Sequence, residues 1–286
     1  MGEGDGSPAY RRFRAHRGGR IGAAIVAVVV GVALAAPLVA PHAPDQPFMA
    51  QAFDALDVPI GSTREFPLGA DALGRCELSR LLFGARISLA VAFAATALAV
   101  VVGTLVGGVA GYFGGKIDTV LMRFVDALLS FPFLLVVMAI NKAVARPGIG
   151  ITFLALGLFA WTGMSRQVRA KVMQTKELEF VAAARALGAS VPRILWSHIL
   201  PSALPLVIVL ASLAAADVLV AESALSFLGV GVVAPTSSWG SMLRDAEPLM
   251  ATAPALSFIP GAAILVTVVG FNLLGEGLRD AFDPGA

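Results

Sequence analysis

Charged residues and cysteine are scarce in this 286-residue chain. Asp, Glu, Lys and Arg make up only 14% of it, whereas hydrophobic residues make up 57%, far from the averages of soluble domains. A soluble protein of this length would have too little charged surface to stay dispersed, so the composition predicts a protein that needs lipid. The single cysteine, Cys76, excludes an internal disulfide and any multi-cysteine metal site.

Signatures of catalysis and of cofactor binding are also missing. Gly115-Lys116 is the only Gly-Lys pair, but Ala110 occupies the place of the first glycine of a phosphate loop, and Ile117 follows where Ser or Thr is required. There is no Gly-x-Ser-x-Gly or His-Glu-x-x-His pattern. The three histidines lie in unrelated contexts: His16, His42 and His198. We therefore expect no catalytic residue, no metal site and no cofactor on this chain. The net charge of only +2 also gives no indication of a basic surface for nucleic-acid binding.

Long apolar runs are what the sequence has instead. Crossing a bilayer takes about 20 apolar residues in a helix. Six runs approach or reach that length, which predicts an all-α integral membrane protein with about six transmembrane helices: 21–40, 87–110, 117–140, 149–162, 203–220 and 256–274. The fourth is the shortest, because Gly and Pro crowd its start, and it could extend to Met164.

Basic residues predict the orientation of these helices. Five arginines precede the first run: Arg11, Arg12, Arg14, Arg17 and Arg20. By the positive-inside rule they hold the N-terminus in the cytoplasm. A cleaved signal peptide is the alternative, although an apolar stretch of about twenty residues exceeds the usual signal core. Six crossings return the C-terminus to the cytoplasm and place there a second basic group: Arg166, Arg169, Lys171, Lys176, Arg185 and Arg193.

This orientation divides the chain into five segments. They are a cytoplasmic N-terminal segment (1–20), a first transmembrane helix (21–40), an extracytoplasmic segment (41–86), a membrane core (87–277) with a cytoplasmic loop at 165–202, and a cytoplasmic C-terminal tail (278–286).

The loop between the fourth and fifth runs contains two short helices. Helix-forming residues extend from Glu177 to Ala189, and Gly188 suits a helix C-terminus. Ser190 can cap a second helix, which Pro201 is expected to end. Because both are too short and too charged to cross a membrane, they predict an elbow at the cytoplasmic face. It is either a loop on lipid headgroups or a docking element for another protein.

The spacing within this elbow resembles the EAA loop of ABC-importer permeases. Ala183-Ala184, Gly188 and Leu200-Pro201 match its Ala-Ala, Gly and Leu-Pro positions. Ala182 replaces the usual Glu and His198 the usual Ile, departures that resemble the dipeptide/oligopeptide/nickel branch of the family. An ATPase contact through a glutamate at position 182 is therefore excluded. That branch often has Arg and Asn at two positions that are serine here: Ser197 and Ser202.

The resemblance extends over most of the chain and favours the C-type subunit. Before and within the second and third runs it rests on Pro67-Leu68-Gly69, Asp71, Leu73-Gly74-Arg75, Leu78-Ser79-Arg80, Gly84 to Leu89, Gly111-Tyr112, Gly114-Gly115, Asp118, Arg123, Asp126 and Pro132. Later it rests on Glu222, Leu225 to Gly229, Trp239-Gly240, Gly277 to Asp280 and Asp283-Pro284. Cys76 departs from a usual Asp, so no role of that Asp is transferred.

The resemblance implies a transport subunit of the bacterial cytoplasmic (inner) membrane that is not itself an enzyme. Its partners would be a B-type permease in a pseudo-symmetric heterodimer, two ABC ATPases that bind ATP and Mg, and an extracytoplasmic binding protein. The implied cargo is dipeptides or oligopeptides, with nickel chelates or glutathione as alternatives. The implied ATPase-coupling residues are Glu179, Ala182, Ala183, Ala184, Arg185, Gly188, His198, Leu200 and Pro201.

Two further sets of residues are singled out by their own chemistry. Gly103, Gly107 and Gly111 are four residues apart, so they share a helix face on which a neighbouring helix can approach closely.

Asp126, with Arg123 one turn earlier, and Asp217 lie in apolar runs, where a lone charge costs on the order of 2.5–3.5 kcal/mol. They are candidates for the translocation path, or buried carboxylates that bond to a neighbouring helix. They are also the only support for the rival class, a secondary transporter driven by an ion gradient.

Overall fold

The computed structural model describes residues 8–55, 58–143 and 149–282 of the chain. Apart from three isolated β-bridges, the regular structure in these residues is helical. The elements are α1 (Pro8–Ala15), α2 (Arg17–Val39), α3 (Glu77–Phe113), α4 (Gly115–Leu129), α5 (Phe133–Ala143), α6 (Ile149–Thr175), α7 (Glu179–Ala186), α8 (Val191–Ile194), η1 (Leu195–Ile199), α9 (Leu200–Phe227), α10 (Trp239–Ala246), η2 (Glu247–Leu249) and α11 (Ala255–Phe282). The prediction of an all-α protein is thus correct.

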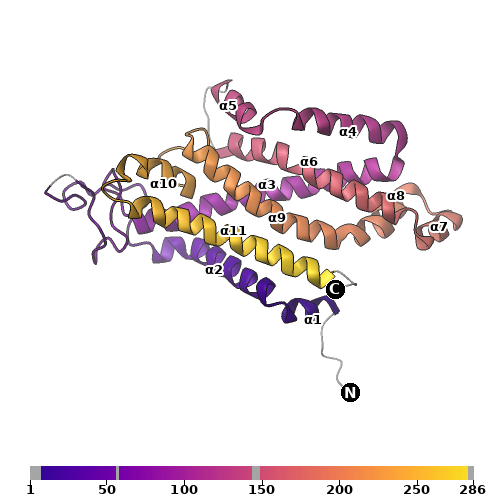
Figure 1. Cartoon of the computed structure of the whole chain (residues 1–286), viewed down its shortest axis with the longest axis horizontal. Coiled ribbons are helices and arrows are strands. Elements are labelled where there is room, and N and C mark those ends of the chain that lie inside the picture. The colour runs from indigo at the N-terminus through magenta and orange to yellow at the C-terminus, as the bar shows by residue number, and fades with distance from the viewer. Residues whose placement is uncertain (1–7, 56–57, 144–148, 283–286) are drawn as a thin grey trace, which may run out of the picture.

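The long helices run side by side along the longest axis of the molecule (Figure 1). At one end lie α1, the end of α11 and the protruding α7. At the other end lie α10 and the irregular segment between α2 and α3. The two ends of the described chain and the predicted elbow therefore share one side of the bundle.

Four helical segments are long and apolar enough to cross a membrane: Arg17–Val39, Glu77–Phe113, Val191–Phe227 and Ala255–Phe282. A fifth crossing is possible where α4 and α5 combine as one bent pair. The sequence predicted six crossings. α6, which contains the fourth predicted crossing, is not among the segments that are long and apolar enough. Four to five crossings by length and composition are what the structure supports.

The second crossing helix begins ten residues before the predicted start at Ile87. Glu77 opens α3, and the first turns carry the charged side chains of Glu77 and Arg80, each no more than 2% exposed. Ionisable residues end an apolar run in the sequence, but they do not end a helix when neighbouring segments bury them. Arg80 is in addition paired with Asp71 and Asp245. The segment boundary predicted at residue 86 therefore lies inside α3 and does not mark the start of this helix.

The third predicted crossing is not one straight helix. α4 ends at Leu129 and α5 begins at Phe133, and their axes are bent by 79°. Pro132 is the last residue of this break and lacks the N–H that would continue the α4 hydrogen-bond ladder. An apolar run with a proline in it thus becomes two helices.

The fifth predicted crossing also differs from the expected pattern. α8, η1 and α9 form one continuous helical segment from Val191 to Phe227, so Pro201 does not end the second elbow helix. In the π-helical turn η1, the Leu200 N–H donates to the Leu195 carbonyl five residues back. We infer that this wider turn relieves the clash that a proline causes in a regular α-helix.

The main hydrophobic core joins α2, α3, α6, α9, α10 and α11. Seven of the seventeen described residues buried in it are alanines, among them Ala92, Ala95, Ala215 and Ala216, and they pack with larger side chains such as Trp239 and Phe271. Small side chains let helix backbones approach closely, which is the packing expected within a bilayer.

Candidate functional site

The elbow, defined here as α7, α8 and η1, is a folded corner. Gly188 has a left-handed backbone with φ of 77°, which suits glycine at a helix C-terminus. Around it the Leu187 N–H donates to the Ala183 carbonyl at 3.0 Å and the Ala189 N–H to the Ala184 carbonyl at 3.1 Å. These bonds satisfy the last carbonyls of α7 and turn the chain toward α8.

One side of the elbow packs against the rest of the chain. Val181, Ala184, Ile194 and Ile199 are buried in a second core with residues of α6 and α9. Leu200 is buried in the same core. Two of the predicted coupling residues, Ala184 and Leu200, therefore face inward and position the elbow without forming its outer surface.

The opposite side of the elbow is open. Glu179, Ala182, Ala183, Arg185, Gly188 and Pro201 are exposed, and His198 is partly exposed. Three large apolar side chains of this surface were missed by sequence reasoning: Phe180 (44% exposed), Leu187 (88%) and Trp196 (58%). Their signal was the helical period, because they fall between the positions that face the core.

The predicted glycine stripe faces the helix from which the elbow emerges. A Cβ added at Gly103 would lie 2.6 Å from Met164 Cγ, and one at Gly111 would lie 2.7 Å from the Arg169 carbonyl oxygen. A Cβ at Gly107 would overlap the Ser165 carbonyl oxygen. α3 and α6 are therefore packed backbone to backbone along this face.

Two ion pairs join α4 to the same helix. Arg169 contacts Asp118 with two bonds of 2.5 Å, and Arg166 Nη2 lies 2.5 Å from Asp126 Oδ1. The sequence suggested Arg123 as the partner of Asp126, one turn away, but the partner comes from another helix. Asp126 is half-exposed and paired, which removes the cost of an isolated charge.

Asp217 lies on the outer surface of α9. It is exposed in the isolated chain, although its neighbours on both sides, Ala216 and Val218, are buried. The described residues include no ion pair with Asp217. The structure therefore places it on a face that this chain leaves uncovered, and it does not bring Asp217 together with Asp126.

The end of the bundle opposite the elbow contains a buried ion cluster. Arg75 and Arg80 both bond to Asp71 and to Asp245, with Arg75 Nε at 2.7 Å from Asp71 Oδ2 and Arg80 Nη2 at 2.8 Å from Asp245 Oδ2. Removing one partner of such a buried cluster costs about 3–5 kcal/mol. The cluster ties the irregular segment and α3 to α10, and Asp245 was missed because it is distant in sequence.

Glu222 organises a second polar cluster beside it. Its carboxylate accepts hydrogen bonds from Ser88 at 3.0 Å and from Ser226 at 2.7 Å, and the Ser226 hydroxyl accepts one from the Val232 N–H. Ser88 also accepts a bond from the Trp239 N–H at 3.2 Å. These residues are scattered through the sequence but join α3, α9 and α10. Their hydrogen bonds therefore hold one end of the bundle together.

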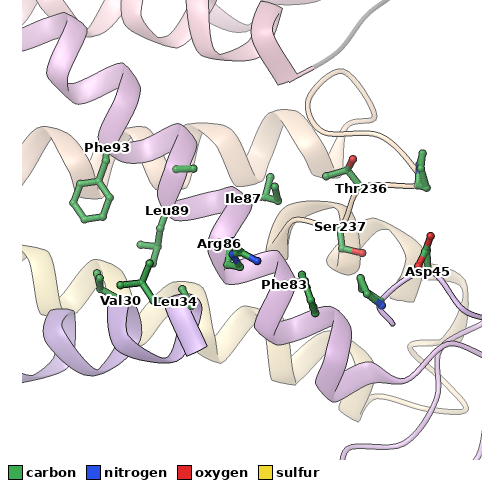
Figure 2. A pocket seen from close by; sticks show the side chains of 14 residues that line it. Val30, Leu34, Asp45, Phe83, Arg86, Ile87, Leu89, Phe93, Thr236 and Ser237 are labelled. Carbon is green, nitrogen blue, oxygen red and sulfur yellow. The ribbon is translucent and has the colours of Figure 1, made fainter. Parts of the chain in front are cut away.

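A cavity of about 650 Å³ opens between α2 and α3 near this end (Figure 2). Its walls are mainly apolar, with Val30, Leu34 and Phe93 on one part and Arg86 near its centre. No group of three or more metal-ligating side chains occurs anywhere in the described residues.

A bundle of helices that are long and apolar enough to cross a bilayer defines an integral membrane protein. The family model of binding-protein-dependent transport system inner membrane components matches residues 99–286, and that of the N-terminal transmembrane domain of oligopeptide transport permease C matches residues 7–57.

Curated relatives agree with these models. The dipeptide transport system permease protein DppC of Bacillus subtilis is 37% identical over 277 residues, which covers 96% of this chain and 84% of the relative. The oligopeptide transport system permease protein OppC of Haemophilus influenzae is 42% identical over 216 residues (76% and 69%). The glutathione transport system permease protein GsiD of Escherichia coli is 37% identical over 275 residues (96% and 89%).

The chain belongs to the family of binding-protein-dependent transport system inner membrane components, with the C-type permeases as its relatives. It is a multi-pass inner membrane permease subunit of an ABC importer, not an enzyme. The comparisons give no support to the ion-gradient alternative.

Proposed function

We propose that this chain is the C-type permease of an importer for short peptides. Relatives named for dipeptide, oligopeptide and glutathione transport support a peptide backbone as the feature common to the cargo. Glutathione is itself a peptide, so that alternative falls within the proposed class of cargo. Nickel chelates find no counterpart among these relatives.

The observation that carries the mechanism is the two-sided elbow. Its inner side is packed against α6 and α9, while its outer side exposes Ala183, Arg185 and Leu187. Exposed large apolar side chains on a protruding corner mark a contact site for another protein. We assign this surface to a partner ATPase, whose ATP-driven movement would shift α6 and α9 and so alternate the access of the path.

The remaining partners follow from surfaces that the chain leaves open. α4, α5 and the break between them expose large apolar side chains, including Phe124, Phe131 and Leu135, which suits a second, B-type permease. In this pseudo-symmetric heterodimer Asp217 would face the path between the subunits. ATP and Mg would bind to the two ATPases, and an extracytoplasmic binding protein would deliver the peptide to the opposite end. The proposal is tested by measuring ATP-dependent peptide uptake by the assembled importer.

The orientation proposed is six crossings with both termini and the elbow in the cytoplasm. This requires the apolar half of α6 to cross as well as the α4–α5 pair. The grouping of α1, α7 and the end of α11 at one end supports it (Figure 1). Residues 1–7 and 283–286, which complete the predicted terminal segments, lie outside the described residues.

Cysteine labelling tests this orientation. Glu179→Cys should react with a membrane-impermeant maleimide only after the cytoplasmic face is opened, whereas Thr236→Cys should react in intact cells. Thr236 is preferable to its neighbour Ser237, which is only 5% exposed. The native Cys76 is fully buried and gives a low background. Reaction of both variants from the same side would exclude the six-crossing arrangement.

A further inference from the structure

Two arginines line an open groove at the corner between α1 and α2. The groove has a volume of about 700 Å³, and its other walls come from Phe13, Ile21, Ala23 and Ala24. Arg17, Arg20 and Ile21 are exposed. Within the part of the chain that the structure describes, neither arginine forms an ion pair with a carboxylate. The groove thus combines apolar walls with two arginines that pair with no carboxylate of residues 8–55, 58–143 and 149–282.

The corner that holds this groove is fixed by contacts on its other side. His16 Nδ1 accepts a hydrogen bond from the Gly19 N–H at 2.8 Å, and His16 Nε2 lies 3.1 Å from Asp280 Oδ2 of α11. A Cβ added at Gly19 would lie 2.8 Å from Gly277 Cα, and one at Gly22 would overlap the Leu274 backbone N. Because this face of α2 is against α11, the side with Arg17 and Arg20 is held outward.

The apolar walls continue directly into the lipid-facing surface of α2. Ile21 is 55% exposed and Val28, two turns further along the same helix, is 64% exposed. The arginines therefore lie at the level where the predicted first crossing begins. A ligand with a phosphate at this level and a hydrocarbon chain along α2 would satisfy both parts of the groove.

We propose that this groove binds an anionic phospholipid of the membrane leaflet on the elbow side. Guanidinium groups bind phosphate oxygens through paired hydrogen bonds. Basic pockets beside membrane helices favour anionic headgroups. A zwitterionic lipid offers less net attraction, because its own cation offsets the phosphate, and free phosphate lacks the chain that would cover Ile21 and Ala24. The lipid would fasten the α1–α2 corner, and with it α11, to the membrane surface.

Native mass spectrometry of the assembled importer tests the site, with phosphatidylglycerol and phosphatidylcholine of identical acyl chains as the probes. Only complexes that retain both ATPases are measured, so misinserted chains do not contribute. Wild-type complexes should retain phosphatidylglycerol preferentially. The double variant Arg17→Gln/Arg20→Gln should weaken its binding by about 25-fold, since each arginine near the surface contributes roughly fivefold.

Two control variants separate a site from general surface charge. Arg11→Gln removes one arginine charge from the exposed surface of α1 outside the groove, and should alter binding by less than about twofold, against roughly fivefold for each groove arginine. Arg17→Lys/Arg20→Lys keeps the charge but loses the paired hydrogen bonds of the guanidinium groups, so its binding should lie between that of wild type and that of the glutamine variant. Equal binding of the two lipids, an equal loss in Arg11→Gln, or a full loss in the lysine variant would each overturn the proposal.

Discussion

Replacing Gly188 by valine is expected to abolish most ATP-driven uptake while the importer still assembles in the membrane. The native φ of 77° is disfavoured for a residue with a Cβ by roughly 1–2 kcal/mol, and a β-branched side chain is disfavoured further. No atom lies within 4 Å of an added Cβ at this position. The defect should therefore arise from backbone strain that distorts the corner, and not from a clash with the crossing helices.

Two substitutions at the same position separate strain from size. Gly188→Ala carries the smallest side chain and should be milder than valine. Gly188→Asn is larger than alanine, but asparagine tolerates the left-handed conformation, so it should be at least as active as the alanine variant. Uptake and peptide-stimulated ATP hydrolysis are measured at matched expression. Normal coupling in Gly188→Val would mean that the elbow does not connect the ATPases to transport.

The second large effect is expected from Gly107→Leu. The first added carbon would already overlap the Ser165 carbonyl oxygen and would lie 3.0 Å from the Arg169 backbone N. Backbone atoms of α6 have no alternative rotamer, so α3 and α6 must separate. Overpacking costs typically 1–3 kcal/mol even where side chains can move. We expect the yield of assembled importer, measured by size-exclusion chromatography, to fall several-fold.

Gly163→Leu is the matched control for this prediction. Gly163 lies on α6 near the contact and is exposed, and among the described residues no atom beyond its own stretch of helix lies within 4 Å of an added Cβ. The same change in size should leave assembly close to wild type there. If Gly107→Leu assembles and transports as well as Gly163→Leu does, the glycine face of α3 is not a tight helix contact.

Local patterns in the sequence predicted the features that depend on local geometry. The four-residue spacing from Gly103 to Gly111 placed three glycines on one face, and a glycine after α7 indicated a left-handed helix end. The apolar runs located each long helix. These features follow from helical periodicity and from backbone conformation, which a few neighbouring residues determine.

Features that depend on distant residues were not predictable in this way. Asp126 pairs with Arg166, forty positions away, and Asp245 closes a cluster with Arg75, 170 positions away. Helical periodicity alone did not show that Ala184 faces inward while Ala183 faces outward, because this depends on where α6 and α9 lie. The bend at Pro132 is a different case, because it arises from local backbone chemistry, and the proline itself was the signal that the hydrophobic pattern concealed.

ATP-dependent uptake by the purified importer, reconstituted into vesicles with its binding protein, tests the central claim most directly. The tagged chain should purify with one related permease and two ATPases. A labelled short peptide should then enter the vesicles only when ATP is present on the elbow side, and ionophores that collapse ion gradients should leave the rate unchanged. Uptake by this chain without ATPases, driven by an ion gradient and abolished by ionophores, would contradict the account.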